Sequence, residues 1–176
     1  MKASWYKSTI ELLVWIGGAI LFALLLRYSV IEKVQVQGSS MLPNFEENQQ
    51  LFVDKVSYRF RDAKRFEVVI VDVPEEPERY IIKRVIGLPG ETVQIKEGKV
   101  YINGKPLDGD IYPNEEEILD GGIAEEEIVL RQNEYFVLGD NRNRSKDSRD
   151  LGPIKKQKIV GRVALRIWPL GEVKVF

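Results

Sequence analysis

The sequence has no cysteine and no histidine among its 176 residues. Without cysteine it forms no disulfide and offers no thiol nucleophile, so cysteine usage indicates no redox compartment. Without histidine, a Ser-His-Asp triad and the usual His/Cys zinc sites are excluded. The formal net charge of −1 gives no bulk attraction to nucleic acid, and we expect no such partner. A catalytic serine would need a carboxylate, a lysine or the chain's own amine as its base.

One long apolar run lies near the N-terminus. The stretch from Leu12 to Leu26 carries no charge. As a helix it would be about 22 Å long, short of the roughly 30 Å hydrocarbon core. Extension to 8–30 gives about 34 Å if the flanking charged residues lie at the two interfaces. We predict a short cytoplasmic tail over 1–8 and an uncleaved transmembrane anchor over 9–31.

A cleaved signal peptide is the main alternative to an anchor. It would require small residues at a cleavage site after Leu26, and the chain continues with the large Arg27-Tyr28. The uninterrupted apolar run disfavours a buried soluble helix. Basic residues flank both ends almost equally, and the short basic tail favours a cytoplasmic N-terminus. We therefore expect a single-pass protein of the cell membrane, with its large domain on the outer face.

The rest of the chain, 32–176, predicts an all-β domain. Short segments rich in Val, Ile, Phe and Tyr are separated by Gly, Pro and Asn, and Glu97-Gly98 is typical of a hairpin turn. Ser57 to Lys64 is expected to form one or two helical turns. The predicted strands are Lys33–Gln37, Leu51–Val56, Phe66–Val73, Arg79–Ile86, Glu91–Lys96, Lys99–Asn103, Glu134–Leu138 and Ile159–Trp168.

Two charge clusters interrupt the strand pattern. An insertion near 104–131 carries nine acidic residues and no basic one between Asp108 and Glu127. It lacks the spacing of a calcium loop, so we expect a solvated surface. The second cluster is basic and is either a solvated face or a surface for anionic headgroups, where each cation contributes roughly 1 kcal/mol. Its members are Lys55, Arg59, Arg61, Lys64 and Arg65.

Lys83 and Arg84 interrupt an apolar strand. Side chains alternate along a strand, so the two cations point to opposite faces and one is directed toward the core. An exposed edge residue is the ordinary interpretation. In the functional interpretation, burial lowers the pKa of Lys83 from about 10.4 toward 7–8, where the neutral amine can take a proton from serine. Arg84 cannot do this, because its pKa stays above about 12.

Two polar stretches could complete such a site. The sequence GSSMLP at Gly38–Pro43 follows a predicted strand, and its serines are either a nucleophile and its neighbour or parts of a polar turn. The sequence GDNRNRSKDSR at Gly139–Arg149 is dense in hydrogen-bonding groups, with acids and arginines that alternate as though to neutralise one another. It is either a solvated loop or a loop held in one conformation beside an active site.

These two stretches, together with YIIKRVIGLPGE at Tyr80–Glu91, resemble the serine, lysine and last boxes of the bacterial type I signal peptidases. The order of the boxes behind an apolar anchor also matches. The resemblance implies an all-β catalytic domain of the signal peptidase type with one N-terminal transmembrane helix. It implies a serine endopeptidase that removes signal peptides from exported preproteins at Ala-x-Ala-like sites. Its partners would be secretory preproteins and the phospholipid membrane, and it would need no metal and no cofactor.

The resemblance also implies the catalytic residues. Ser40 is the nucleophile, Ser39 is its neighbour in the turn, and Lys83 is the general base. The backbone N–H of Ser40 is one donor of the oxyanion hole, and the second donor lies at Gly38 or Ser39. An acyl-enzyme would form on Ser40 and be hydrolysed by water.

Supporting residues follow from the same resemblance. Ser145 matches the serine that orients the lysine, and Asp147 and Arg149 match a structural ion pair. Asn44 stands where the family often has Thr, and we expect it to lie outside the chemistry. Small pockets for the alanines of the substrate would be built from Val34, Val36, Met41, Phe45 and Ile82.

Other classes fit the residues less well. The self-cleaving repressors share a Ser-Lys dyad but would carry a DNA-binding N-terminus instead of an apolar anchor. A penicillin-binding enzyme needs Lys where Pro43 stands, and an α/β-hydrolase elbow needs Gly where Leu42 stands. A membrane-tethered β-module without activity stays open. The joint presence of Ser40, Lys83 and Ser145 argues against it.

Overall fold

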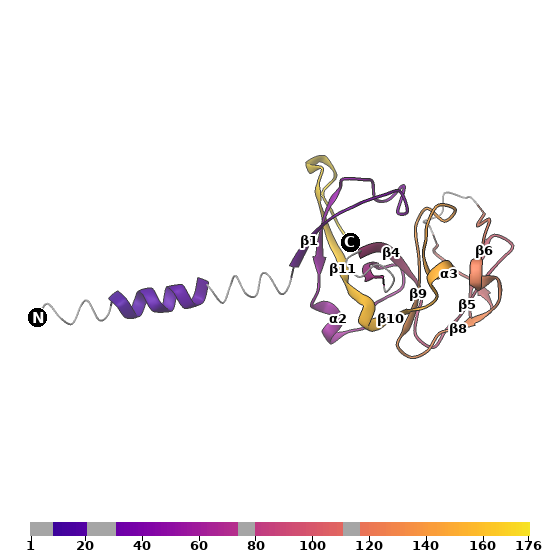
Figure 1. The fold of residues 1–176 in the computed structure, drawn as a ribbon, viewed down its shortest axis with the longest axis horizontal. Helices are drawn as coiled ribbons and strands as arrows, with labels where there is room; N and C mark the ends of the chain where they lie inside the picture. The colour runs from indigo at the N-terminus through magenta and orange to yellow at the C-terminus, as the bar shows by residue number, and fades with distance from the viewer. Residues whose placement is uncertain (1–8, 21–30, 74–79, 111–116) are drawn as a thin grey trace, which may run out of the picture.

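The protein consists of a mostly β domain that begins at Ile31 and a preceding helix over residues 9–20 (Figure 1). The computed structural model describes residues 9–20, 31–73, 80–110 and 117–176. Within these ranges, no helix has the length and apolar character needed to cross a membrane. The tail predicted over 1–8 and the part of the predicted anchor over 21–30 lie outside the described residues.

A large antiparallel sheet forms the body of the domain. Its strands run in the order β1-β2-β11-β3-β4-β9-β10, and β12 pairs with β11. The strand β1 therefore lies at one edge of the sheet. The strands are β1 (Ile31–Gln35), β2 (Gln50–Asp54), β3 (Val68–Asp72), β4 (Tyr80–Gly87), β9 (Glu134–Leu138), β10 (Ile154–Lys155), β11 (Ile159–Trp168) and β12 (Lys174–Val175).

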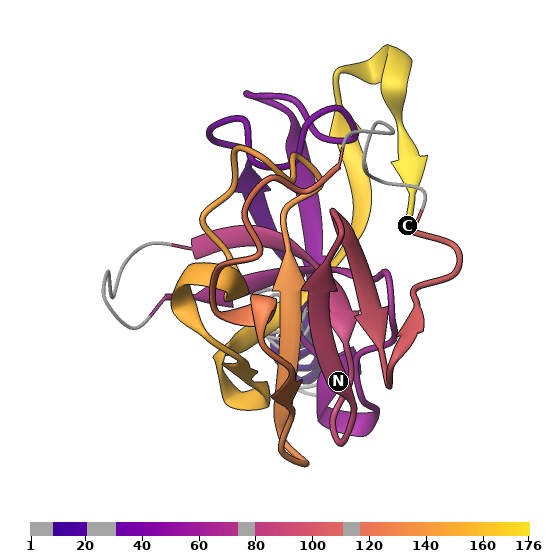
Figure 2. The same ribbon diagram turned by 90° about the vertical axis from the view of Figure 1, so that its right-hand side faces the viewer.

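A smaller sheet forms the opposite end of the domain and faces the viewer in Figure 2. Its hairpin turn has the predicted residues: Glu97 and Gly98 adopt φ of 51° and 69° between the paired Lys96 and Lys99. Positive φ at both central positions is the geometry that such a two-residue turn requires. The strands, in the order β7-β6-β5-β8, are β5 (Thr92–Lys96), β6 (Lys99–Ile102), β7 (Lys105–Pro106) and β8 (Ile128–Val129).

All eight predicted strands are present, with ends displaced by at most two residues. The two-residue strands β7, β8, β10 and β12 were not predicted, because two residues carry no periodic pattern. The helical turn expected within 57–64 is α2 (Ser57–Phe60). Short 3₁₀ segments cover η1 (Gly122–Glu125), η2 (Lys156–Lys158) and η3 (Leu170–Glu172).

One hydrophobic cluster fixes the serine turn to the large sheet. Val36, Met41 and Phe45 come from the chain on both sides of Ser40, and each is at most 2% exposed. They pack with apolar residues of β2, β3, β4 and β11. Phe45 also stacks on Phe176, with 4.9 Å between the ring centroids. Because the turn is anchored from both sides, the position of Ser40 is set by the core.

Candidate active site

Ser40 lies in the turn that follows β1. The chain enters the turn through Gly38, whose φ of +77° lies in the left-handed region that favours glycine. It closes with a hydrogen bond from the Phe45 N–H to the Met41 carbonyl, 2.9 Å long. Ser39 is exposed at the surface of the turn, whereas Ser40 is half-buried. The two neighbouring serines therefore occupy different environments.

Lys83 comes to Ser40 from β4. Its side chain is buried, with the residue 2% exposed. Its Nζ lies 2.8 Å from the Ser40 Oγ and 3.0 Å from the Ile82 carbonyl oxygen, both within hydrogen-bonding distance. The structure thus joins a serine hydroxyl and a lysine amine that are 43 residues apart in the sequence. Of the two serines in the turn, this contact involves the one that the resemblance implies.

Arg84 is also buried, so the strand directs both of its neighbouring cations inward. Its guanidinium donates two hydrogen bonds to the Asp140 carboxylate, at 2.7 and 2.6 Å, and a third to the Phe66 carbonyl at 2.7 Å. The Asn44 amide reaches the same carboxylate at 3.1 Å. Asn44 therefore links the serine turn to the strand of Lys83. We had expected Asn44 to lie outside the chemistry, and that expectation did not include this link.

Asp147 holds the stretch Gly139–Arg149 in one conformation. Its carboxylate accepts hydrogen bonds from the Gly139 N–H at 3.0 Å and from the Arg149 guanidinium at 2.9 Å twice. It also caps α3 (Ser148–Leu151) in a capping box with Asp150. Burial lowers the pKa of Arg149, but the hydrogen bonds and charge of Asp147 outweigh it and raise that pKa. The ion pair implied by the resemblance is present.

The Ser145 side chain lies between Gly139 and the serine turn. A Cβ added to Gly139 would collide with the Ser145 side chain and with the Ser40 carbonyl oxygen, which is 2.5 Å away. The Ser145 Oγ is buried and makes no hydrogen bond within the described part of the chain. The structure therefore places Ser145 next to Ser40 but does not contain a hydrogen bond between the Ser145 hydroxyl and Lys83.

The acidic insertion contacts this stretch from outside. Arg142 donates two hydrogen bonds of 2.8 Å to the Asp110 carboxylate. The Asn143 side chain binds the backbone of Glu117 and Leu119. Part of the acidic segment is therefore a structural neighbour of the site and not only a solvated surface. Among the described residues, no group of three or more acidic side chains is arranged to hold a metal ion.

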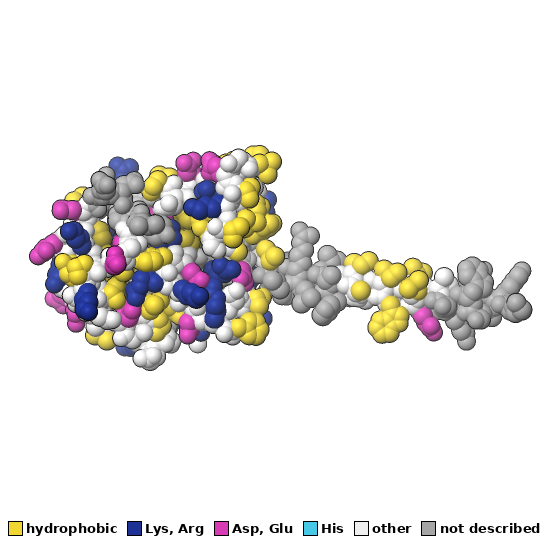
Figure 3. Space-filling model, turned by 180° about the vertical axis from the view of Figure 1, so that it is seen from behind, with side chains coloured by type: hydrophobic (Ala, Val, Ile, Leu, Met, Phe, Trp, Pro, Cys, Tyr) yellow, Lys and Arg dark blue, Asp and Glu magenta, His cyan; other side chains and the backbone are white. Residues whose placement is uncertain are grey.

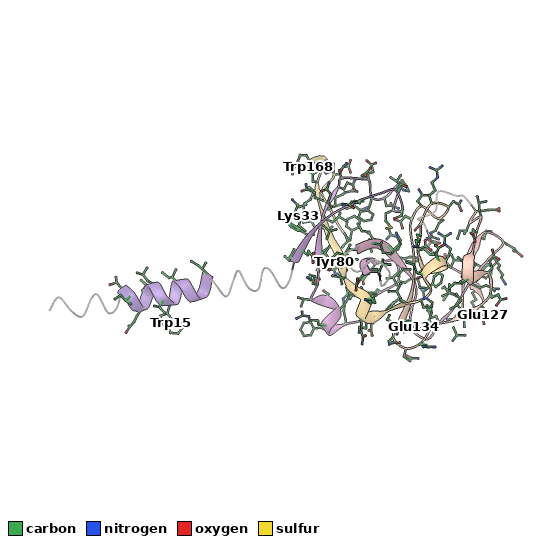
Figure 4. The ribbon with its side chains drawn as sticks, in the orientation of Figure 1. Trp15, Lys33, Tyr80, Glu127, Glu134 and Trp168 are labelled. Atoms are coloured by element: carbon green, nitrogen blue, oxygen red, sulfur yellow. The ribbon has the colours of Figure 1, made fainter. Side chains whose placement is uncertain are left out.

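The Ser40 and Lys83 side chains line a cavity of about 240 Å³. Tyr80, which is labelled in Figure 4 and 47% exposed, lies at its wall. Phe45 does not line the cavity: it is fully buried in the core beneath the turn. The other four residues expected to form substrate pockets do line it, namely Val34, Val36, Met41 and Ile82.

Several known proteins are similar to this chain over most of its length. The family model described as "Signal peptidase, peptidase S26" matches residues 9–168. The chain is 37% identical to a signal peptidase I of Leptolyngbya laminosa, over 90% of this chain and 79% of the relative. It is 36% identical to signal peptidase I V of Bacillus subtilis, over 81% of this chain and 89% of the relative. The chain belongs to the signal peptidase I family. It is therefore an enzyme, a serine peptidase of family S26.

A solved signal peptidase I from Enterococcus faecalis was also found. It is 31% identical to this signal peptidase, and the match covers 59% of this chain and 98% of that one, with a TM-score of 0.48.

Sequence reasoning did not identify two partners of the site in this signal peptidase. The alternation of acids and arginines in Gly139–Arg149 predicted ion pairs within this stretch. Asp147 and Arg149 form such a pair. Asp140 instead pairs with Arg84, and Arg142 with Asp110. A buried arginine requires a carboxylate, so the apolar strand around Arg84 was itself a signal for a distant acid.

Proposed function

We propose that this signal peptidase cleaves exported preproteins with Ser40 as nucleophile and Lys83 as general base. The observation that carries the proposal is the 2.8 Å contact between the Ser40 Oγ and the buried Lys83 Nζ. Lys83 must be neutral to accept a proton, and burial disfavours its charged form. A buried amine at this distance is suited to activate a serine hydroxyl in a chain without histidine.

The reaction has two halves. Ser40 Oγ attacks the carbonyl carbon of the scissile bond while Lys83 takes the hydroxyl proton. Lys83 then gives that proton to the leaving amine, the C–N bond breaks, and the mature protein departs from an ester on Ser40. In the second half, water attacks the ester, Lys83 accepts a water proton, and the proton returns to Ser40. The signal peptide leaves with a carboxylate.

The cavity suits an extended substrate. The strand β1 lies at the edge of the sheet, and β4 pairs with β9 only from Arg84 onward. The side of β4 at Tyr80–Ile82 and the end of β1 both border the cavity. A preprotein strand between them can bind through its backbone. The volume of about 240 Å³ and the apolar side chains in part of the wall favour small residues, as in Ala-x-Ala.

Two supporting roles belong to the same proposal. The backbone N–H of Ser40 is proposed to stabilise the oxyanion, with a second donor from Gly38 or Ser39. Ser145 is proposed to orient Lys83. Its buried hydroxyl has no hydrogen-bond partner among the described residues and lies beside the serine turn, which supports this role.

A membrane anchor is proposed for residues 9–31. The helix over 9–20 exposes its apolar side chains, among them Trp15 at 78% and Val14 at 68%. Exposed apolar side chains of this number are stable in lipid rather than in water. The N-terminus would lie in the cytoplasm and the β domain on the outer face, where exported preproteins emerge.

The experiment that tests this function is cleavage of a purified Ala-x-Ala preprotein by the full chain in lipid. The mature product should begin directly after the second alanine, as shown by N-terminal sequencing. A rapidly quenched reaction should contain the signal peptide as an ester on Ser40, detected by mass spectrometry. Replacing the second alanine with a large residue should abolish cleavage. An inert wild type would overturn the proposal.

A further inference from the structure

A second hollow shares no lining residue with the proposed catalytic cavity. It measures about 650 Å³ and is lined mainly by apolar side chains of β2, β11 and α2. Ile31, the first residue of β1, also lines it. Side chains alternate along β1, so Ile31 points to the opposite face from Val34 and Val36, which line the catalytic cavity. The proposed substrate site does not include this groove.

The groove leaves large apolar side chains in contact with solvent. Phe60 is 84% exposed and Ile31 is 48% exposed, and both belong to its wall. Phe52 and Leu165, which face each other across the β2–β11 pair, complete its floor. A contiguous apolar groove of this kind indicates a binding site for an apolar partner.

Among the described residues that line the groove, the one carboxylate is paired with partners of the domain. Asp54 accepts hydrogen bonds from the Val56 and Ser57 N–H groups, from the Ser57 hydroxyl and from the Arg162 guanidinium. Its oxygens are therefore occupied by partners within the domain. An apolar ligand would not meet an unpaired charge.

Three basic side chains lie in or near the segment that forms one wall of the groove. Arg61 belongs to its wall, and Lys55 and Arg59 come from the same short segment as α2. Lys55 pairs with Glu32 and Arg61 with Glu67, while Arg59 is exposed. Figure 3 shows apolar side chains, with basic and acidic ones beside them, on the end of the domain where the N-terminal segment joins. Apolar walls and a basic rim are complementary to a lipid with an anionic headgroup.

The groove lies close in sequence to the proposed membrane anchor. The groove begins at Ile31, and the uncharged apolar run ends at Leu26. Five residues reach at most about 17 Å. If the anchor spans the membrane, as proposed above, the groove cannot lie far from the bilayer surface.

We propose that this groove binds one acyl chain of an anionic phospholipid, with Arg59 and Arg61 at the headgroup. The acyl chain lies against Phe52, Phe60 and Leu165. The proposal rests on the proposed membrane anchor and concerns a site separate from Ser40 and Lys83. Binding there would orient the domain on the membrane through a second point of attachment beside the anchor.

The absence of cysteine allows a direct test. The full chain with Lys55→Cys at the rim of the groove is labelled with a small fluorophore and reconstituted in vesicles of equimolar phosphatidylglycerol and phosphatidylcholine. Lys99→Cys, an exposed lysine of β6 in the smaller sheet, is the matched control. With bromine on the phospholipid acyl chains, we expect at least about two-fold quenching at position 55 and none at position 99. Equal signals at both positions would overturn the proposal.

Two variants separate a groove from a general surface contact. Ala164→Trp fills the groove from its wall, and Ala164→Leu does so with less risk to folding. Both should retain preprotein cleavage in detergent and lose the quenching at position 55. Persistent quenching in a variant that still cleaves preprotein would show surface contact only and contradict the groove. Arg59→Glu, or vesicles of phosphatidylcholine alone, should weaken the quenching roughly three-fold or more, and no change would contradict the headgroup contact.

The failure of the anchor is distinguishable from the failure of the groove. If the anchor proposal is wrong, the wild-type protein will not float with the vesicles in a density gradient. If only the groove proposal is wrong, the protein will float and cleave preprotein, and the label at position 55 will not be quenched.

Discussion

At the scale of single residues, the site depends on close contacts between three separate parts of the sequence. Ser40 comes from a turn, Lys83 from a strand and Gly139 from a loop. The Lys83 Nζ contacts the Ser40 Oγ, and Gly139 lies against the Ser40 carbonyl oxygen and the Ser145 side chain. The sequence could supply the chemistry of a serine and a lysine. It could not supply the contact of Gly139 with Ser145, because that depends on the packing of two loops.

Gly139→Ala should impair both folding and catalysis. The new Cβ would overlap the Ser145 side chain and lie 2.5 Å from the Ser40 carbonyl oxygen, so the serine turn or the loop must move. We expect a loss of about 1–3 kcal/mol in the free energy of unfolding and a drop of at least about ten-fold in kcat. Thermal unfolding and cleavage assays measure these. Gly171→Ala, which meets no atom within 4 Å, is the control and should resemble the wild type.

Phe45→Leu should reduce stability without changing substrate preference. Phe45 is fully buried, stacks on Phe176 and does not line the cavity. Loss of the ring leaves a partly filled space, and we expect a cost of about 1–3 kcal/mol. Chemical unfolding gives the cost, and cleavage of substrates with Ala, Ser or Val before the scissile bond gives the preference. A changed preference would restore Phe45 to the substrate pocket.

Asp54 should contribute to stability above acid pH. Burial raises the pKa of its carboxyl, but hydrogen bonds from Ser57, Val56 and Arg162 outweigh burial and lower that pKa to about 2. An unfolded aspartate titrates near 3.9, so this contribution is complete above about pH 5 and is lost as pH falls through about 2. Asp54→Asn should lower the free energy of unfolding by about 1–2 kcal/mol near neutral pH. It should also make that free energy depend less on pH below about pH 5.

Urea unfolding at several pH values checks this prediction. Asp108→Asn removes an exposed carboxylate and serves as the control. If the free energy of unfolding falls as steeply with decreasing pH in Asp54→Asn as in the wild type, the role of Asp54 is contradicted.

At the scale of elements, the long strands could be predicted and the contacts between loops could not. Strands β9 and β11 were predicted at their observed ends, because their apolar and β-branched residues form regular runs bounded by turn residues. The acidic insertion was expected to be a solvated surface. Its contact with the third polar stretch depends on Asp110 meeting Arg142, which lies 32 residues away. No local pattern predicts such a pair.

Asp110→Asn should loosen the loop that carries Ser145. The neutral amide cannot balance the buried Arg142 guanidinium, whose other hydrogen bond goes to the Gly139 carbonyl. We expect kcat to fall roughly five- to twenty-fold, with a smaller change in KM, because the proposed substrate pockets on β1 and β4 stay in place. Faster amide hydrogen exchange across Gly139–Arg149 should accompany the loss.

Glu127→Gln is the matched control for this prediction, since it removes an exposed acid of the same insertion that lies far from the cavity (Figure 4). A kcat for Asp110→Asn equal to that of Glu127→Gln would show that the insertion does not position the loop.

At the scale of the whole molecule, the proposed membrane anchor and the β domain are connected where the chain enters β1. The serine turn follows directly after this strand, and the proposed lipid groove begins with its first residue. The proposed catalytic cavity and the groove therefore lie at opposite ends of one edge strand. This arrangement would hold the cavity near the surface from which membrane-bound preproteins emerge.

The most direct test of the central claim is the rate at which the full chain in lipid cleaves a purified Ala-x-Ala preprotein, compared with Ser40→Ala, Ser39→Ala and Lys83→Ala. We expect Ser40→Ala and Lys83→Ala each to lose activity by a factor of at least about 10³, because nucleophile and base act as one unit. Ser39→Ala should keep most of its rate. Full activity of Lys83→Ala, or loss in Ser39→Ala with retention in Ser40→Ala, would contradict the Ser40–Lys83 dyad.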